Sequence, residues 1–191
     1  MLGIKAWVVN PYRIPSASME PTLHCAEPEP GCQARFSDRV LANRFLYHFK
    51  TPERGDIVVF ETPEEAELQC RERGTFVKRI IGLPGDRVVV DRQGFVTLNG
   101  APLDESGYVA PERRGGREDS LTVPEDSYYV LGDNRRSSCD SRFWGALDED
   151  RIIGKVFAIY WPPQRIGLAA IVVGLSLLPL GFRAGRKPPP R

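Results

Sequence analysis

A series of short β-branched runs, each bounded by Gly, Pro or Asp, constrains the fold more than any other feature of the sequence. The runs occupy residues 56–60, 76–81, 87–90, 95–98, 128–131 and 152–160. Short runs rich in Val and Ile are typical of strands, and Asn99-Gly100 is a strong hairpin signal. The runs do not alternate with helical segments, as they would in a parallel βαβ fold. The sequence therefore predicts a mainly β fold, in which coiled antiparallel sheets form a barrel-like domain.

The length fits one such domain with an appendage. At 191 residues, the chain is within the range of roughly 100–200 residues that is usual for a single core. We expect a main β domain over residues 11–162, in which residues 86–130 form a small β insert. Within this domain, the segment 61–74 fits one or two helical turns or a solvated loop, and the segment 108–119 is expected to be an exposed, mobile excursion.

The most apolar run of the sequence follows the β domain. From Ile166 to Phe182 there are 17 residues without a charged side chain. A helix of that length spans roughly 26 Å, close to the ~30 Å hydrocarbon core of a bilayer. We therefore predict a transmembrane helix over residues 163–183, with Arg165 reaching toward the lipid headgroups. The alternative is a buried core helix that ends at Pro179.

The charge distribution agrees with a membrane anchor. The formal net charge is only +1, which argues against a nucleic-acid partner, because such proteins carry a clear basic excess. The last nine residues contain four basic side chains and no acidic one, so the rest of the chain has a net charge of −3. By the positive-inside rule, the basic tail over residues 184–191 stays in the cytoplasm. We expect a single-pass protein of the plasma membrane, whose β domain is extracytoplasmic and contacts membrane lipid.

The N-terminal residues 1–10 form a second, weaker apolar stretch. Lys5 interrupts it, and a stretch this short cannot cross a bilayer as a helix. A first strand and an interfacial anchor are both compatible with this segment.

The four cysteines point to a disulfide rather than to a metal site. They form no C-x-x-C pair, and the sequence has only two histidines, so a zinc site is not expected. Cys25 and Cys32 flank a Pro-rich loop, where a bridge would contribute roughly 2.5 kcal/mol through loop closure. We predict that disulfide. Cys70 and Cys139 are expected to be free, with a second disulfide as the alternative.

Two serines lie in a segment held between prolines. In Ile14–Leu23 (IPSASMEPTL) the hydroxyls of Ser16 and Ser18 are two residues apart, so an extended backbone places them on the same side. Taken alone, the segment is also compatible with an ordinary Ser/Pro loop. A Ser-His-Asp triad would need His24 or His48, and both lie in segments typical of loops or surfaces.

A lysine in the run 76–81 offers a base without a histidine. On a strand, Phe76, Lys78 and Ile80 share one face, which places the amine between two apolar side chains. Such a lysine either extends to solvent or loses its proton, because desolvation lowers the lysine pKa from about 10.4. A neutral lysine can act as the general base for a serine nucleophile. The polar, hydroxyl-rich segment 132–145 follows a strand, as a loop that supports such a site should.

Together these segments resemble one family, the bacterial type I signal peptidases, which are membrane-bound serine proteases with a Ser/Lys dyad. The chain contains four motifs in the family's order: S-M-E-P-T-L, R-G-D-I-V-V-F, V-K-R-I-I-G-L-P-G-D and G-D-N-R-x-S-x-x-D-S-R-x-W-G. The resemblance extends from Pro11 to about Trp161. It implies that the β domain is catalytic and that the enzyme uses no cofactor and no metal.

The resemblance also implies the roles of single residues. Ser18 corresponds to the nucleophile and Lys78 to the general base. The hydroxyl of Ser16 and the backbone N–H of Ser18 correspond to the oxyanion hole. Ser138 corresponds to the serine that orients the lysine, with the neighbouring Ser137 as the alternative. The residues that correspond to structural support of the site are Asp133, Asp140 and Arg142.

The implied function is the removal of signal peptides from secretory preproteins. Resemblance to the family implies cleavage after small residues, at an A-x-A-like site presented as an extended strand. We expect a monomer. The alternative function is a catalytically inactive, membrane-anchored β domain that binds extended peptides. Such a protein would be expected to lose Ser18 or Lys78, and both are present. The chain departs from the family's pattern in its short N-terminal apolar stretch, its short insert, and residues Arg136 and Ser137.

Overall fold

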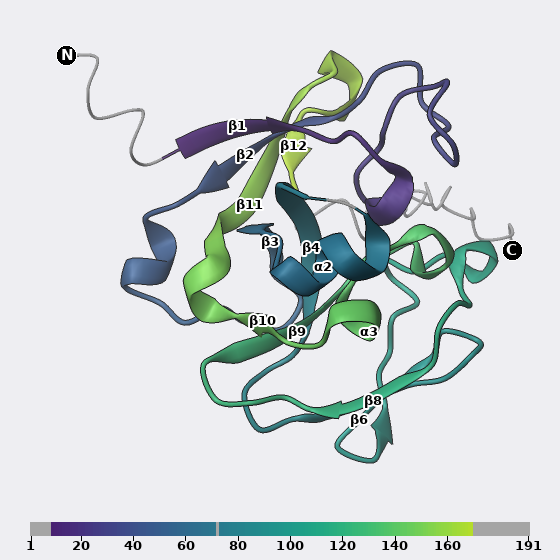
Figure 1. The fold of residues 1–191 in the computed structure, drawn as a ribbon. Coiled ribbons are helices and arrows are strands. Elements are labelled where there is room, and N and C mark those ends of the chain that lie inside the picture. Colours follow the sequence, from purple (N-terminus) through teal and green to yellow (C-terminus); the bar gives the residue numbers. More distant parts are fainter. Residues whose placement is uncertain (1–8, 72, 170–191) are drawn as a thin grey trace, which may run out of the picture.

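A large antiparallel sheet organises the fold. In the computed structural model, which describes residues 9–71 and 73–169, eight strands run in the order β1-β2-β11-β3-β4-β9-β10, with β12 paired to β11 (Figure 1). Their bounds are β1 Val9–Arg13, β2 Arg39–Asn43, β3 Ile57–Glu61, β4 Thr75–Gly82, β9 Ser127–Leu131, β10 Leu147–Asp148, β11 Ile152–Trp161 and β12 Gly167–Leu168. Each of these pairings is antiparallel. The prediction of a mainly β fold with antiparallel sheets is confirmed.

A second, smaller sheet lies below the first in the view of Figure 1. Its four strands run in the order β7-β6-β5-β8. Their bounds are β5 Arg87–Val90, β6 Val96–Leu98, β7 Ala101–Pro102 and β8 Asp119–Thr122. These strands fall within residues 86–130, whereas β9, at the end of that segment, belongs to the large sheet. Asn99 and Gly100 both have positive φ at the turn between β6 and β7, as their sequence indicates.

The core lies on both faces of the large sheet. On β3, Val59 packs into one buried cluster, whereas its neighbours Val58 and Phe60 pack into another. On β4, Ile80 and Ile81 likewise belong to different clusters. This alternation follows from the two-residue period of a strand, and it explains why β3 is continuously apolar from Ile57 to Phe60. The third cluster joins the two sheets, because it contains side chains of both β5 and β9.

Short helices connect the strands. The α-helices are α2 (Glu64–Cys70) and α3 (Ser141–Trp144). The 3-10 helices are η1 Ala17–Met19, η2 Leu46–His48, η3 Pro111–Arg113, η4 Arg135–Ser137, η5 Glu149–Arg151 and η6 Pro163–Arg165. Of the two structures expected for segment 61–74, the helical turns are present, as α2. The segment 108–119 differs from the expected excursion, because Val109 is buried and β8 begins at Asp119.

The first part of the predicted transmembrane segment belongs to the β domain instead. Residues 163–165 form η6, and Gly167 and Leu168 pair with β11 as β12. Arg165 does not reach outward, since its Nε donates to the buried carboxylate of Asp38 at 2.9 and 3.1 Å. A buried carboxylate needs a charged partner, which holds this segment on the domain. Residues 170–183 of the predicted helix and the tail 184–191 lie outside the described residues. Among residues 9–71 and 73–169, no helix is long and apolar enough to cross a membrane.

The start of the described chain is a strand. Val9 and Asn10, the last residues of the predicted N-terminal segment 1–10, belong to β1 and pair with Asn43 and Ala42 of β2. Residues 1–8 lie outside the described residues. Of the two expected structures, residues 9 and 10 therefore adopt the strand.

The structure contains two disulfides. The predicted bridge between Cys25 and Cys32 is present. Cys70 and Cys139 are also bridged, so the expectation that they are free is wrong and the alternative of a second pair is right. Helices α2 and α3 pack against each other, which brings the two Cα atoms to 6.2 Å, within reach of a disulfide. The sequence could not show this proximity, since 69 residues separate the two cysteines.

Candidate active site

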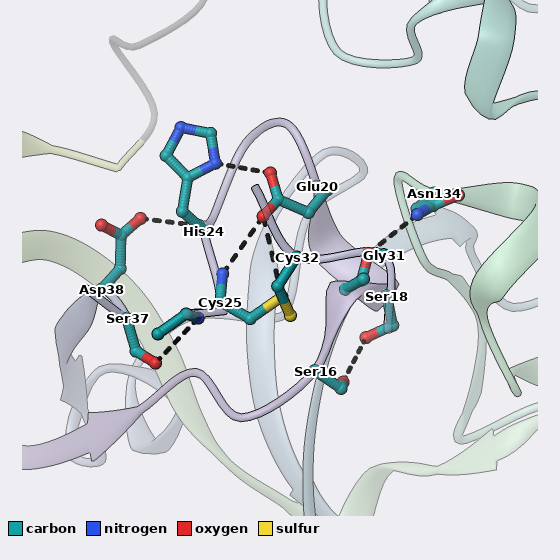
Figure 2. The surroundings of a disulfide bond; sticks show 12 residues. Ser16, Ser18, Glu20, His24, Cys25, Gly31, Cys32, Ser37, Asp38 and Asn134 are labelled. Carbon is teal, nitrogen blue, oxygen red and sulfur yellow. Dashed lines mark hydrogen bonds and ion pairs between the residues drawn. A yellow bond between two sulfur atoms is a disulfide. The ribbon is translucent and has the colours of Figure 1, made fainter. Parts of the chain in front are cut away.

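Ser18 lies in the single turn η1, where the chain passes beside the large sheet. Its neighbours Ala17 and Met19 are buried in the core, and Ser18 itself is only 8% exposed. The turn is tied to the loop after β9 by two hydrogen bonds from Asn134. The backbone N–H of Asn134 donates to the Ser18 carbonyl at 3.0 Å, and its Nδ2 donates to the Ala17 carbonyl at 3.0 Å (Figure 2).

Lys78 reaches Ser18 from the neighbouring strand β4. Its Nζ lies 2.9 Å from Ser18 Oγ, and the lysine is only 3% exposed. The same Nζ lies 3.2 Å from the Val77 carbonyl and 5.0 Å from the centre of the Phe76 ring. Phe76 and Ile80 pack into one core cluster, as expected for residues on one face of the strand. The structure thus brings the predicted nucleophile and base into direct contact across 60 residues of sequence.

Ser16 presents its hydroxyl on the same side as Ser18. Its Oγ donates to Ser18 Oγ at 3.3 Å, as Figure 2 shows. Unlike Ser18, Ser16 is exposed. The proline-bounded segment therefore places both hydroxyls together, next to the amine of Lys78.

Ser138 is close to this group but makes no contact with Lys78 of the predicted kind. Its Oγ is buried and has no hydrogen-bond partner among the described residues. A Cβ built on Gly132 would collide with both Ser138 Oγ and the Ser18 carbonyl. The absence of a side chain at Gly132 therefore allows the Ser138 loop to lie directly against the nucleophile. The neighbouring Ser137 lines the cleft instead.

Asp133 joins strand β4 to the turn that follows η1. It accepts two hydrogen bonds from Arg79, at 2.8 Å from Nε and 2.7 Å from Nη2, and one from Thr22 Oγ1 at 2.5 Å. Burial opposes the charge of Arg79, but the hydrogen bonds that Arg79 donates to Asp133 and the charge of that carboxylate outweigh burial and raise the pKa of Arg79. Arg79 and Thr22 were not predicted as site residues, although both lie in motifs that also contain Lys78 and Ser18. Their shared partner is visible only in the folded chain.

Asp140 and Arg142 form a buried pair that shapes the same loop. Arg142 donates to Asp140 at 2.7 Å from Nε and 2.8 Å from Nη2. Asp140 also accepts the Gly132 N–H at 3.1 Å, and Arg142 Nη2 donates to the Arg135 carbonyl at 2.6 Å. Although burial opposes the charge, hydrogen bonds to Asp140 raise the pKa of Arg142. Both residues therefore brace the backbone from Gly132 onward.

Neither histidine takes part in the group around Ser18. The ring of His24 contacts the buried carboxylate of Glu20 at 2.5 Å (Figure 2), and the ring of His48 packs on Phe45. Glu20 also accepts the Cys25 N–H at 3.2 Å, which ties it to the first disulfide. Glu20, for which no role was predicted, thus keeps the chain after the nucleophile in place.

Ser16, Ser18 and Lys78 line a cleft of about 530 Å³. One wall is the segment before and around Ser18, and the other is the start of β4. The lining residues are Tyr12, Arg13, Ile14, Pro15, Ser16, Ser18, Met19, Arg71, Arg73, Thr75, Phe76, Val77, Lys78, Ser137 and Cys139. No three His, Cys, Asp or Glu side chains gather as metal ligands within residues 9–71 and 73–169. The site offers a buried hydroxyl, an adjacent amine and an open cleft, which together suit nucleophilic catalysis on an extended substrate.

Comparison with known families gives this geometry a context. The family described as "Signal peptidase, peptidase S26" matches residues 1–161. The chain belongs to this family. As a member of the signal peptidase family it is a serine endopeptidase, a hydrolase of peptide bonds.

Curated proteins of this family are similar over most of the chain. A probable signal peptidase I-2 of Synechocystis sp. is 41% identical over 167 residues, which are 87% of this chain and 70% of that protein. The signal peptidase I of Leptolyngbya laminosa is 41% identical over 169 residues, 87% of this chain and 75% of that protein. A crystal structure of a signal peptidase I from Enterococcus faecalis is 31% identical, with a TM-score of 0.43, covering 56% of this chain and 97% of that one.

Proposed function

We propose that this signal peptidase removes signal peptides from secretory preproteins with Ser18 as the nucleophile and Lys78 as the general base. The observation that carries the proposal is the 2.9 Å contact between Lys78 Nζ and Ser18 Oγ at the cleft, with the lysine only 3% exposed. Burial of an amine favours its neutral form, and only the neutral form can accept the serine proton.

The reaction follows from this contact in two halves. In the first, Lys78 takes the proton of Ser18 as Oγ attacks the scissile carbonyl carbon, and the ammonium then gives that proton to the leaving amine. The products of this half are the free mature chain and an ester between Ser18 and the signal peptide. In the second, Lys78 takes a proton from water as the water oxygen attacks the ester, and it returns the proton to Ser18 Oγ.

The negative charge that develops on the carbonyl oxygen needs hydrogen-bond donors. We assign this role to the hydroxyl of Ser16 and the backbone N–H of Ser18. The 3.3 Å contact between the two serine hydroxyls supports the assignment of Ser16. A donor of this kind typically contributes about 3 kcal/mol of transition-state stabilisation.

Four further residues are proposed to hold the dyad in place. Ser138 would orient Lys78, which its buried, unpaired hydroxyl beside the Ser18 carbonyl supports. Catalytic hydrogen bonds are often long or poorly aligned before substrate binds. Asp133, Asp140 and Arg142 would support the loop that carries Ser138, through the hydrogen bonds described above.

The substrate is proposed to bind as an extended chain with small residues before the scissile bond. The cleft supports this, because the largely extended segments 12–16 and 75–78 line it and Ser18 and Lys78 belong to its two walls. The alternative, a catalytically inactive domain that binds extended peptides, would use the same cleft. The two functions differ in whether the bound peptide is cut.

A preprotein cleavage assay tests the dyad. Ser18→Ala and Lys78→Ala should each lower kcat by at least about 10³-fold, because each removes one member of a unit that acts together. The exposed residues Ser120 and Lys50 provide matched controls, and Ser120→Ala and Lys50→Ala should cleave like the wild type. Wild-type processing by either dyad variant would refute the assignment, and a wild-type protein without cleavage would favour the peptide-binding alternative.

The enzyme is also proposed to be a monomer anchored once in the plasma membrane, with the β domain extracytoplasmic and the C-terminus cytoplasmic. The apolar residues 170–182 and the basic residues after them support this orientation. Near the end of the described chain, Trp161, Ile166 and Leu168 are 39%, 65% and 52% exposed, as suits contact with lipid. A reporter fused after Arg191 should be active only in the cytoplasm, and an external signal would overturn the orientation.

A further inference from the structure

A buried carboxylate of the small-sheet region lies at the centre of a second charged network. Glu105, between β7 and η3, is only 1% exposed. Its Oε2 accepts hydrogen bonds from Arg135 Nη1 at 3.0 Å and Arg114 Nη1 at 3.3 Å. Its Oε1 accepts one from Arg135 Nη2 and one from the Tyr108 hydroxyl at 3.2 Å. The fully buried carboxylate therefore accepts four hydrogen bonds from three side chains.

The first branch of this network runs to the loop beside the nucleophile. Arg135 is 1% exposed, and its Nε donates to the Gly132 carbonyl at 3.1 Å. Its Nη1 also donates to the Gly94 carbonyl at 3.0 Å, which anchors it to the small sheet. Gly132 is the residue that packs against Ser18 and Ser138. The position of Arg135, fixed by Glu105, therefore sets how closely this loop approaches the nucleophile.

The second branch runs to the strand that carries the base. The ring of Tyr108 covers the Arg79 guanidinium at 4.3 Å, and its hydroxyl is held by Glu105. Arg79 directly follows Lys78 on β4 and is fixed on its other side by Asp133. Tyr108 therefore holds the side chain next to Lys78 in position. The one carboxylate is thus connected to Ser18 through Arg135 and Gly132 and to Lys78 through Tyr108 and Arg79.

The two branches explain why a carboxylate is buried here. A buried ion pair is weak evidence for stability, since desolvation offsets much of the attraction between its charges. Its geometric effect is larger, because a bidentate guanidinium fixes both the distance and the angle between the groups that it joins. A displacement of about 1 Å at a catalytic group can cost roughly 100-fold in rate.

We infer that Glu105 is a positioning residue, which fixes the distance between Ser18 and Lys78 from the small-sheet region through Arg135 and Tyr108. This inference rests on the proposed Ser/Lys function. Glu105 itself touches neither dyad residue in any contact described above, and its effect passes through side chains that do not react.

The test compares Glu105→Gln with Glu118→Gln in steady-state cleavage of a preprotein peptide. Glu118 is a matched control, because it also pairs in a bidentate way with an arginine, Arg92, but at the surface. For folded protein, Glu105→Gln should lower kcat at least about tenfold and leave KM within about twofold. Glu118→Gln should match the wild type in both constants.

A second variant covers the case in which Glu105→Gln does not fold. Glu105→Asp keeps the charge balance and withdraws the carboxylate by one methylene, so it should fold and lose kcat several-fold at unchanged KM. Wild-type kcat in folded Glu105→Gln or in Glu105→Asp would overturn the inference, as would a loss confined to KM or to thermal stability. Ser18→Ala is measured alongside. Cleavage by that variant would refute the proposed dyad itself, whereas failure at Glu105 alone would leave the dyad standing.

Discussion

The hydroxyl of Ser138 is buried beside the nucleophile without a hydrogen-bond partner among the described residues. A buried hydroxyl without a partner costs stability, so its removal should be neutral or slightly stabilising. Ser138→Ala should therefore keep or raise the free energy of unfolding. If the hydroxyl orients Lys78 during the reaction, the same variant should lower kcat by about tenfold or more.

Ser137→Ala is the matched control for that experiment. Ser137 lines the cleft one residue away, and we expect its variant to retain wild-type kcat. A larger loss in Ser137→Ala than in Ser138→Ala would move the orienting role to Ser137. Unchanged kcat in both variants, measured beside chemical unfolding curves, would remove serine from this role.

At the level of single residues, the sequence predicted the reactive side chains better than the side chains that hold them in place. Ser16, Ser18 and Lys78 lie in recognisable motifs, and the structure brings them together. Glu105 and Arg79 escaped prediction because their functions depend on partners far away in sequence. Arg79 meets Asp133 across 54 residues, and Glu105 meets Arg135 across 30. Local chemistry marks a nucleophile, but only the fold shows which charges are paired.

Among the elements, the strands that contain Val-, Ile- or aromatic-rich runs were predictable and the other strands were not. β3, β4, β5, β6, β9 and β11 correspond closely to predicted runs. The N-terminal segment 1–10 was open to two interpretations, and the strand β1 that begins in it has Pro11 in its middle. The strand order places β1 at the edge of the sheet, where proline is tolerated because one side needs no ladder hydrogen bond. The pairing partners, rather than the local sequence, define such strands.

For the segment after β11, the sequence predicted a regular element that residues 163–169 do not form. Its apolar composition predicted a membrane helix from residue 163, but residues 163–169 form a 3-10 turn and a short strand. The buried carboxylate of Asp38 accepts hydrogen bonds from Arg165 and so holds this segment on the β domain. Hydropathy cannot include a contact with a residue 127 positions earlier.

For the whole molecule, buried tyrosines predict how stability depends on pH. Burial and then the nearby Asp56 raise the pKa of Tyr47, and burial with a hydrogen bond to Asp119 raises the pKa of Tyr129. Burial, with Glu149 nearby, raises the pKa of Tyr128 to about 12. Because these values are raised in the folded state, the unfolded chain releases the protons first. Their contribution to stability is complete below about pH 10 and is lost as the pH rises through the folded values.

Chemical unfolding at about pH 8 and about pH 11 measures this effect, with tyrosinate absorbance followed in parallel. The free energy of unfolding should fall between the two pH values. Tyr129→Phe should reduce that fall, because one ionising group has been removed. The exposed Tyr160 is the control position, and Tyr160→Phe should leave the fall unchanged. Equal stability of the wild type at both pH values would contradict the prediction.

The cluster of Thr22, Arg79 and Asp133 has a consequence for when this chain becomes active. Its members come from three distant parts of the sequence, and Thr22 meets Asp133 across 111 residues. Contacts between such distant residues form late in folding, because a long loop must close, at a cost in conformational entropy, before the contacts can stabilise the fold. During synthesis, the nucleophile leaves the ribosome long before the loop that supports it. A partly made chain therefore carries Ser18 without an assembled site, and proteolytic activity begins only when nearly the whole domain has been completed.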